Sequence, residues 1–219
     1  MNKKIIYKNN IDLYIDNHKI HTKIIVCRCK NLLKTIVLEK LDLSDKDKVF
    51  FLSLSKKRKI EFLGIRYALK YLGIKKMFYN KKRKPLLFSK NKYISLSHSF
   101  EKIAVSISSY HIGIDIEKLR KDKKIVKIKK KFIREDESIF INTNYEEDYL
   151  HIIWGIKESL YKLEGGLFYS FLNHYKVSPF CIKKDDCISC WIIKNTYSKK
   201  FSAFYKKIGD HYLVYSIDK

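Results

Sequence analysis

Gly113-Ile114-Asp115-Ile116-Glu117 is the stretch that most constrains both the fold and the chemistry of this chain. Isoleucine alternates here with other residue types, which is typical of a β-strand with one apolar face. Asp115 and Glu117 then project together from the other face, about 6.5–7 Å apart along the strand. Two carboxylates at this spacing can bind one hard cation between their oxygens. For this stretch alone, the alternative is an exposed strand edge.

A second stretch, Trp154-Gly155-Ile156-Lys157-Glu158-Ser159, lies in the most strongly periodic segment of the chain, from about residue 148 to residue 164. Apolar residues recur there at helical spacing, and two glycines follow as a stop signal. On the predicted helix Trp154, Glu158 and Lys162 share one face, because they are four residues apart. The helix therefore adds a carboxylate and a cation to the pair on the strand.

Asp115, Glu117 and Glu158 together predict a magnesium site, provided that the helix packs beside the strand. Mg²⁺ in proteins usually takes a few carboxylates and completes its shell with substrate phosphate oxygens and water. Lys157 and Lys162 are candidates for neutralising phosphate charge. For Lys162 the alternative is a surface ion pair with Glu158, worth only ~0.3–0.5 kcal/mol. The whole set indicates a site that handles a phosphate ester.

The composition of the 219 residues, 46% hydrophobic and 14% aromatic, excludes a disordered chain. A net charge of +24 raises the possibility of nucleic-acid binding. The lysines are spread along the whole chain, however, and an excess of Lys, Asn, Ile and Tyr is also what an AT-rich genome produces. A basic surface suits an acidic protein partner or a polyphosphate ligand equally well.

No apolar run approaches the ~20 residues that span a bilayer, and the N-terminal residues lack the apolar core of a signal peptide. We therefore expect a cytoplasmic protein that does not enter a membrane. Five cysteines, an odd number, exclude a complete set of intramolecular disulfides. Cys187-x-x-Cys190 is half of a zinc knuckle without its second half, so reduced and packed thiols are expected.

The order of predicted elements is strands, helix, strands, followed by strand, helix, strands. This order predicts an α+β fold of two similarly built halves, residues 1–110 and 111–219, that meet near residues 109–113. In the first half the sequence predicts a helix from Ser55 to Tyr71 or Leu72 and several strands, at 23–29, 35–38, 93–97 and 103–107.

Basic residues of the first half form two clusters, Lys56–Lys59 with Arg66 and Lys81–Lys84. Each cluster alone is interpreted as a solvated face. Together with His98, which ends a predicted strand, they can bind a ligand that carries several phosphates. A structural or solvated role is the alternative for His98. The chain has no Walker loop, dinucleotide fingerprint or nucleophile elbow, which argues against a P-loop NTPase, a Rossmann dehydrogenase and an α/β-hydrolase.

With these motifs in order, the sequence resembles the Sfp-type 4'-phosphopantetheinyl transferases. Two signatures of that family match Gly113–Glu117 and the segment Trp154-x-x-Lys157-Glu158-Ser159-x-x-Lys162. Other similar segments lie between residues 56 and 166, in the family's order: Arg58-Lys59-x-Glu61, Lys84-Pro85, Ser97-His98-Ser99 and Lys131-Phe132-Ile133-x-Glu135-x-Glu137. One departure stands out, because Arg83 replaces the glycine that the family has before Lys84-Pro85.

The resemblance implies two α+β halves in a pseudo-twofold arrangement with coenzyme A in the cleft between them. It implies that Asp115, Glu117 and Glu158 hold Mg²⁺ on the coenzyme A pyrophosphate and that Lys162 assists at the phosphates. Residues 1–110 would then bind the adenine and 3'-phosphate end of coenzyme A. The residues implied for that end are Arg58, Lys84, Pro85 and His98.

The implied reaction transfers the 4'-phosphopantetheine arm to a serine hydroxyl of an apo acyl or peptidyl carrier protein and releases 3',5'-ADP. Glu158 would be the general base. The basic segment 123–140 is expected to meet the acidic recognition helix of the carrier, since opposite charges steer association. We expect a monomer. The alternatives are a basic nucleic-acid-binding protein, which leaves the carboxylates unexplained, and an inactive relative that binds coenzyme A or a carrier.

Overall fold

The computed structural model describes residues 3–8, 11–18, 21–29, 33, 38–41, 43–89, 91–120, 122–166 and 170–218, with the backbone alone for residues 3–18, 38 and 39. Two five-stranded antiparallel sheets dominate it. The first has the order β1 (Lys3–Lys8), β2 (Ile11–His18), β3 (Thr22–Arg28), β7 (Lys102–Ser108), β6 (Tyr93–Ser99). The second has the order β8 (His111–Lys118), β12 (His211–Asp218), β11 (Tyr197–Ile208), β10 (Cys187–Lys194), β9 (Tyr175–Val177).

Two long helices flank these sheets. α3 (Lys56–Tyr71) follows Ser55, and α6 (Glu146–Glu164) ends at Gly165, which has the left-handed φ of 91° that glycine adopts without strain. The shorter elements are α2 (Asp45–Ser53), α4 (Lys124–Ile128), α5 (Glu135–Ser138), the hairpin of β4 (Met77–Tyr79) and β5 (Pro85–Leu87), and the 3₁₀ turns η1 (Leu38–Leu41), η2 (Lys129–Lys131) and η3 (Thr143–Tyr145). The mixed α and β class is thus confirmed.

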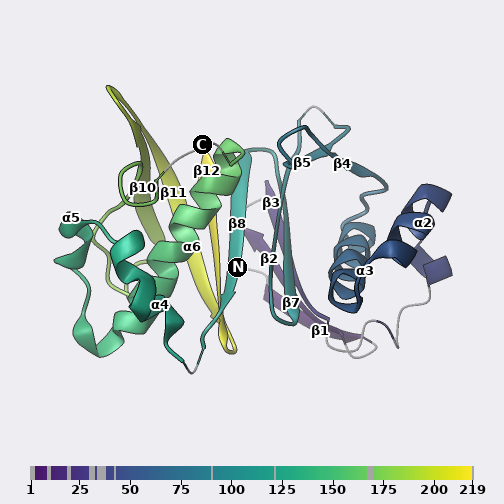
Figure 1. Cartoon of the computed structure of the whole chain (residues 1–219), viewed down its shortest axis with the longest axis horizontal. Helices are drawn as coiled ribbons and strands as arrows, with labels where there is room; N and C mark the ends of the chain where they lie inside the picture. The colour runs from purple at the N-terminus through teal and green to yellow at the C-terminus, as the bar shows by residue number, and fades with distance from the viewer. Residues whose placement is uncertain are drawn as a thin grey trace.

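Three apolar clusters show how these elements stack (Figure 1). α3 packs on one face of the first sheet, while α6 packs on one face of the second. The remaining faces of the two sheets meet each other, where Ile24 and Val26 of β3 pack against Ile112, Ile114 and Ile116 of β8. Each sheet therefore lies between its own helix and the other sheet, and β3 and β8 are buried on both of their faces.

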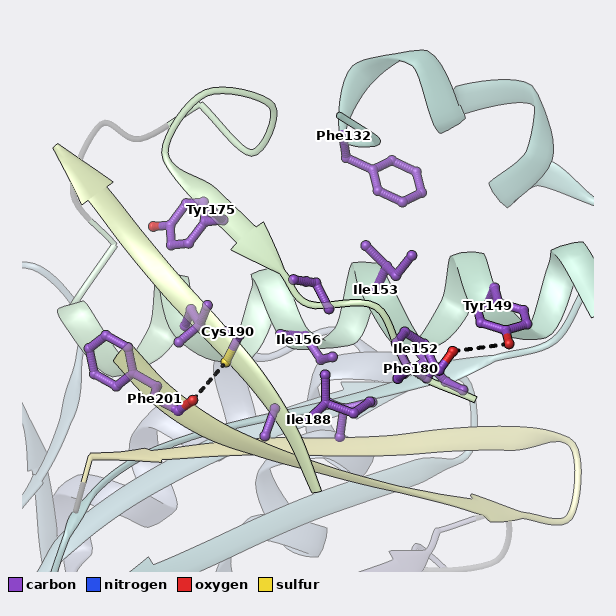
Figure 2. Close-up of a cluster of buried hydrophobic side chains, with 14 of the residues drawn as sticks. Phe132, Tyr149, Ile152, Ile153, Ile156, Tyr175, Phe180, Ile188, Cys190 and Phe201 are labelled. Carbon is purple, nitrogen blue, oxygen red and sulfur yellow. Dashed lines mark hydrogen bonds between the residues drawn. The ribbon is translucent and has the colours of Figure 1, made fainter. Parts of the chain in front are cut away.

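The cluster between α6 and the second sheet is drawn in Figure 2. Ile152, Ile153 and Ile156 of α6 are fully buried there, as the helical periodicity predicts. Tyr149 also belongs to this cluster, and its buried hydroxyl donates to the Phe180 carbonyl at 3.2 Å. α6 is thereby held firmly enough to position the polar residues along its edge.

Glycines allow α6 to approach the sheet closely. A Cβ atom on Gly113 would lie 1.8 Å from the Ser159 carbonyl oxygen, and one on Gly155 would lie 2.5 Å from a Val214 methyl group. Any side chain at Gly113 would therefore push α6 away from β8. The glycine that opens the diagnostic stretch has a structural task, which is to bring the helix onto the strand that carries Asp115 and Glu117.

Several smaller predictions can now be assessed. The strands predicted at 23–29, 93–97 and 103–107 form, and the helix predicted from Ser55 is α3. The strand predicted at 35–38 lies largely outside the described residues. All five cysteines are free, but packing is confirmed only for Cys27, Cys29 and Cys190, because Cys181 and Cys187 are exposed. None of the helices in the described ranges combines the length and apolar character needed to cross a bilayer.

Candidate active site

Asp115 is the buried centre of the candidate site. Its Oδ1 atom accepts hydrogen bonds from Ser97 Oγ at 2.9 Å and from Lys162 Nζ at 2.8 Å. Its Oδ2 atom is buried and has no hydrogen-bond partner within the part of the chain that is described. A buried, unpaired carboxylate oxygen is costly, so this atom indicates where a positively charged ligand would be favoured.

Glu117 lies two residues further along β8 and accepts a hydrogen bond from Ser99 Oγ at 3.0 Å. Burial, followed by the negative charge of Asp115, raises the pKa of the Glu117 carboxyl group. The hydrogen bond from Ser99 opposes this rise. The two strand carboxylates therefore repel each other in a partly dry environment.

Glu158 joins the two strand carboxylates because α6 packs directly against β8, which is the condition that the predicted magnesium site required. Burial and the charge of Asp115 raise the pKa of Glu158 to about 7, while Lys162 lowers it and Glu117 raises it further. A carboxyl group with a pKa near neutrality can exchange a proton during a reaction. It also gains most from an added cation.

Lys162 extends from α6 to β8 and lies among these groups with its side chain 26% exposed. Its Nζ atom donates to Asp115 Oδ1, to Ser97 Oγ at 2.9 Å and to the Ile114 carbonyl at 3.1 Å. The predicted alternative, a simple surface pair with Glu158, is wrong, because the ion pair is made with Asp115 at 2.8 Å.

The donor set fits a divalent cation in its chemistry. Carboxylate oxygens are the ligands that Mg²⁺ prefers. Burial, followed by the charge of Asp115, raises the pKa values of Glu117 and Glu158, so a cation beside these carboxylates would be favourable. Among the described residues, however, no three His, Cys, Asp or Glu side chains are placed to hold one ion. Lys162 occupies Asp115 Oδ1 instead, which leaves Oδ2 as the free ligand atom.

A pocket of about 370 Å³ opens beside this cluster. The side chains of Ser97 and Lys162, which contact Asp115, also line the pocket, so the carboxylates and the pocket share a wall. Most of the remaining polar lining is basic. The pocket lining includes all four residues predicted to bind coenzyme A: Arg58, Lys84, Pro85 and His98.

Arg58 and His98 are linked through a residue to which the sequence assigned no role. Glu61 accepts from Arg58 Nη1 at 3.0 Å, and its other oxygen lies 3.4 Å from His98 Nδ1. Burial lowers the pKa of His98, Glu61 raises it, and the charges of Arg58 and Lys162 lower it again. Glu61 thereby holds two groups at the pocket that could bind an anion.

Lys84 crosses from the first half of the chain to the end of α6. Its Nζ atom donates to the Leu163 carbonyl at 2.5 Å, and burial lowers its pKa against the opposing effect of Glu164. A cation at a helix C-terminus is favourable because the last carbonyls carry partial negative charge. Lys84 therefore lines the pocket and also joins the β4–β5 hairpin to the helix that carries Glu158.

The family model of the 4'-phosphopantetheinyl transferase superfamily matches residues 111–214. Residues 111–214 belong to this superfamily. A related protein, the 4'-phosphopantetheinyl transferase gsp of Aneurinibacillus migulanus, is 31% identical over 103 residues. That alignment covers 41% of this chain and 43% of the relative, so the chain matches less than half the length of that protein.

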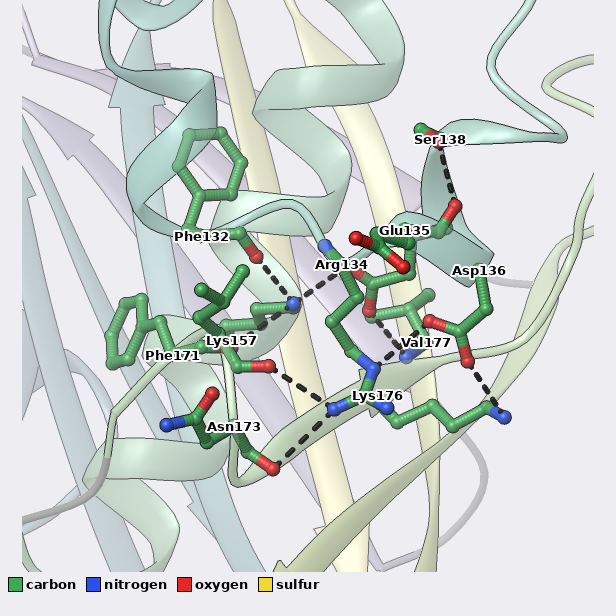
Figure 3. Close-up of polar contacts among 12 residues, drawn as sticks. Phe132, Arg134, Glu135, Asp136, Ser138, Lys157, Phe171, Asn173, Lys176 and Val177 are labelled. Atoms are coloured by element: carbon green, nitrogen blue, oxygen red, sulfur yellow. Dashed lines mark hydrogen bonds and ion pairs between the residues drawn. The ribbon is translucent and has the colours of Figure 1, made fainter.

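The prediction made for Lys157, which lies on α6, requires a correction. It was a candidate for neutralising phosphate, but its side chain is fully buried and ion-paired with Glu137 at 2.7 Å. Its Nζ atom also donates to the carbonyls of Phe132 at 2.5 Å and Phe171 at 3.1 Å (Figure 3). Lys157 is not among the residues that line the pocket. It joins α6 to α5 and to the loops that contain Phe132 and Phe171, so its role is structural.

Arg83 adopts a backbone conformation that favours glycine. Its φ is 59°, in the left-handed region, where a side chain costs roughly 1–2 kcal/mol. The turn is otherwise well satisfied, because Asn80 Oδ1 accepts from the backbone N–H groups of Lys82 and Lys84. The turn thus forms with arginine at this position.

Replacing Arg83 with glycine should therefore stabilise the protein by about 0.5–1 kcal/mol, because glycine adopts this φ without strain. The measurement is the free energy of unfolding from urea titration. Lys82→Gly is the matched control, because φ at Lys82 is not positive and glycine there only adds freedom to the unfolded chain. An R83G protein that is no more stable than K82G would contradict the strain argument.

The superfamily resemblance missed the parts played by Ser97, Ser99 and Glu61. Ser97 contacts Asp115, and Ser99 contacts Glu117. The sequence signal for this was the spacing of the two serines, because residues two positions apart on a strand share a face. For Glu61 the signal was its place three residues after Arg58, within reach on one side of a helix.

Proposed function

We propose that this chain transfers the 4'-phosphopantetheine arm of coenzyme A to a serine hydroxyl of an apo acyl or peptidyl carrier protein, in a Mg²⁺-dependent reaction that releases 3',5'-ADP. The observation that carries the proposal is the shared wall between the basic pocket and the carboxylate cluster, formed by Ser97 and Lys162. Superfamily membership of residues 111–214 supports the same reaction class.

The charge of the pocket suits the nucleotide end of coenzyme A, which carries three phosphate groups. Arg58 and His98, both at the pocket wall, are proposed to bind the 3'-phosphate together with Lys84, with Pro85 shaping the turn beside them. This end of the ligand would thus contact the half formed by residues 1–110. Lys162 is proposed to contact the pyrophosphate.

Asp115, Glu117 and Glu158 are the residues that would hold Mg²⁺, and Asp115 Oδ2 is the ligand atom without another partner among the described residues. When bound, the ion supplies charge stabilisation at the pyrophosphate oxygens. The metal site would therefore belong to the half formed by residues 111–219.

Glu158 is proposed as the general base. Its carboxylate takes the proton of the carrier serine as the serine oxygen forms a bond to the β-phosphorus of coenzyme A. The bond between that phosphorus and the bridging oxygen breaks, and the electron pair leaves with 3',5'-ADP. Lys162 neutralises charge on the departing phosphate. The role of general base suits the pKa of about 7 at Glu158, because a group with a pKa near neutrality can both accept and release a proton.

A second pocket supports the carrier as partner. It has a volume of about 300 Å³ and is lined in part by Glu117, while Ile125 and Trp154 contribute apolar surface. Lys118, Arg120 and Lys124 add positive charge to its lining. An acidic carrier helix with an apolar residue beside its serine matches this surface. We further propose a monomeric, cytoplasmic enzyme.

The stability of the protein should depend on Mg²⁺ and on pH together. Glu158 keeps its proton to about pH 7 in the folded chain but loses it near 4.5 when unfolded, so its burial costs stability increasingly as pH rises through this window. Bound Mg²⁺ removes that cost. We therefore expect Mg²⁺ to raise Tm more at about pH 8 than at about pH 5.5, with apparent affinity falling about tenfold per pH unit below 7.

Thermal melts with and without Mg²⁺ at both pH values measure this dependence. Samples that contain EDTA give the metal-free baseline. Glu158→Gln is the control variant, since it carries no titrating group. An equal rise in Tm at the two pH values for the unaltered protein would contradict the assignment of Glu158 as a metal ligand.

The proposed function is tested by the intact mass of an apo carrier protein after incubation with this protein, coenzyme A and Mg²⁺. We expect a gain of one phosphopantetheine arm that disappears with EDTA. No gain on several apo carriers, with a folded protein that still binds coenzyme A, would instead identify an inactive relative. Absence of both transfer and coenzyme A binding would overturn the proposal.

A further inference from the structure

Three serines at alternate positions of β6 face the neighbouring strand β8. The hydroxyl oxygens of Ser95, Ser97 and Ser99 accept hydrogen bonds from the backbone N–H groups of β8. The bonds are Ile114 N to Ser95 at 3.1 Å, Ile116 N to Ser97 at 3.2 Å and Lys118 N to Ser99 at 3.2 Å. All three serines are buried. We name this arrangement the serine ladder.

The rungs of the serine ladder differ in their side-chain contacts, and Ser97 alone among them also accepts a hydrogen bond from Lys162 Nζ, at 2.9 Å. Ser97 and Ser99 each use the hydroxyl proton to donate to a carboxylate, Asp115 at 2.9 Å and Glu117 at 3.0 Å. Each carboxylate belongs to the residue just before the one whose N–H donates to the same serine: Asp115 precedes Ile116, and Glu117 precedes Lys118. The corresponding residue for Ser95 is Gly113, which has no side chain. Two rungs thus contact the candidate metal ligands, and the third makes only the backbone contact.

A serine hydroxyl has one donor and two acceptor sites, so its proton is directed once its oxygen accepts from a fixed backbone N–H. Accepting that bond also strengthens the bond it donates. The rigid backbone of β8 therefore fixes the hydroxyl of Ser97, and the hydroxyl fixes Asp115 Oδ1. With Oδ1 held, Oδ2 is left buried and without a partner among the described residues.

We infer that Ser97 and Ser99 are positioning residues that orient Asp115 and Glu117 for a divalent cation, whereas the Ser95 hydroxyl joins the strands and also lies at the pocket wall. This inference rests on the metal site of the proposed function. The hydrogen bonds of the ladder restrict the side chains of Asp115 and Glu117 to one orientation each. The two strands that form these bonds, β6 and β8, belong to different sheets. Loss of a partner that orients a metal ligand typically costs about 10–100-fold in metal affinity.

The experiment measures Mn²⁺ affinity by the electron paramagnetic resonance signal of the free ion, with coenzyme A present. Mn²⁺ serves as the probe because it takes oxygen ligands as Mg²⁺ does. Ser97→Ala and Ser99→Ala should each raise the dissociation constant about tenfold or more. Ser95→Ala is the matched control, since it removes the same kind of backbone bond without touching a carboxylate. Ser95 also lines the pocket proposed for coenzyme A, so coenzyme A is kept saturating for every variant, and the Mn²⁺ dissociation constant of Ser95→Ala should then stay within about twofold of that of the unaltered protein.

Equal weakening by all three substitutions would overturn the inference, because the ladder would then act through the fold alone. A Ser97→Ala protein with unchanged Mn²⁺ affinity but a higher KM for coenzyme A would also overturn it, and would make Ser97 a ligand contact of the pocket. If the unaltered protein does not bind Mn²⁺ at all, the metal site of the proposed function fails, which is a distinct result. Should an alanine variant not fold, Ser97→Cys and Ser99→Cys keep the volume with a much weaker donor.

Discussion

Asp115→Ala is expected to abolish phosphopantetheine transfer and to leave the fold intact. The substitution removes a buried carboxylate that carries an unpaired oxygen, so the folded state loses little. Transfer, by contrast, loses its central candidate metal ligand and the partner that places Lys162. We expect the rate to fall by about 100-fold or more, which is the order of magnitude seen when one preorganised group that stabilises transition-state charge is removed.

Glu158→Ala is expected to have a comparable effect, since Glu158 is proposed both to hold the metal and to accept the serine proton. Initial rates of carrier modification measure both variants, and circular dichroism verifies their folding. Glu164→Ala is a matched control, because Glu164 is a glutamate on the same helix at its C-terminal end. Retained transfer in both the Asp115 and Glu158 variants would remove the metal-site assignment.

The second large effect is expected from Lys157→Met. This substitution leaves Glu137 as a buried carboxylate without its cation, since both side chains of the pair are fully buried. Breaking one partner of such a pair costs about 3–5 kcal/mol. Burial already lowers the pKa of Lys157 to about 8 against the opposing charge of Glu137, which shows how strongly this environment disfavours an unbalanced charge.

Urea denaturation of the Lys157→Met protein measures that cost. Lys162→Met is the matched control, because it changes the same residue type on the same helix but at a side chain that is partly exposed. We expect Lys162→Met to impair transfer with a smaller loss of stability, because Asp115 keeps its hydrogen bond from Ser97. Lys157→Met should lose more stability and keep transfer at temperatures where it still folds. Equal stability of the two variants would contradict the structural role of Lys157.

The opposite roles of Lys157 and Glu158 show what the sequence could and could not predict. Helical periodicity placed α6 within two residues of its observed start, because its apolar stripe repeats over more than four turns. The periodicity did not show which elements contact the residues on either side of the apolar face of α6. Glu158 faces β8, whereas Lys157, one residue earlier, faces the buried Glu137 of α5. Two adjacent charged residues look alike in sequence, and only packing separates them.

The strand that carries the carboxylates was predictable for a different reason. Alternation at 113–117 fixes which side chains share a face, and burial of Ile114 and Ile116 against the first sheet confirms that face. Partners from distant segments had no local signal of that strength. Glu61 and the three ladder serines become neighbours of the site only when the two sheets meet. The pseudo-twofold relation between the halves and the boundary at 110 stay predictions.

The serine ladder also has a consequence for solubility. β6 and β8 are the terminal strands of their sheets, and such strands expose backbone groups that can recruit a strand from another molecule. In this protein the two edges lie against each other, and side-chain hydroxyls satisfy the amide groups that a foreign strand would need. The same contacts that are proposed to orient the carboxylates therefore protect both edges from intermolecular β-pairing and aggregation.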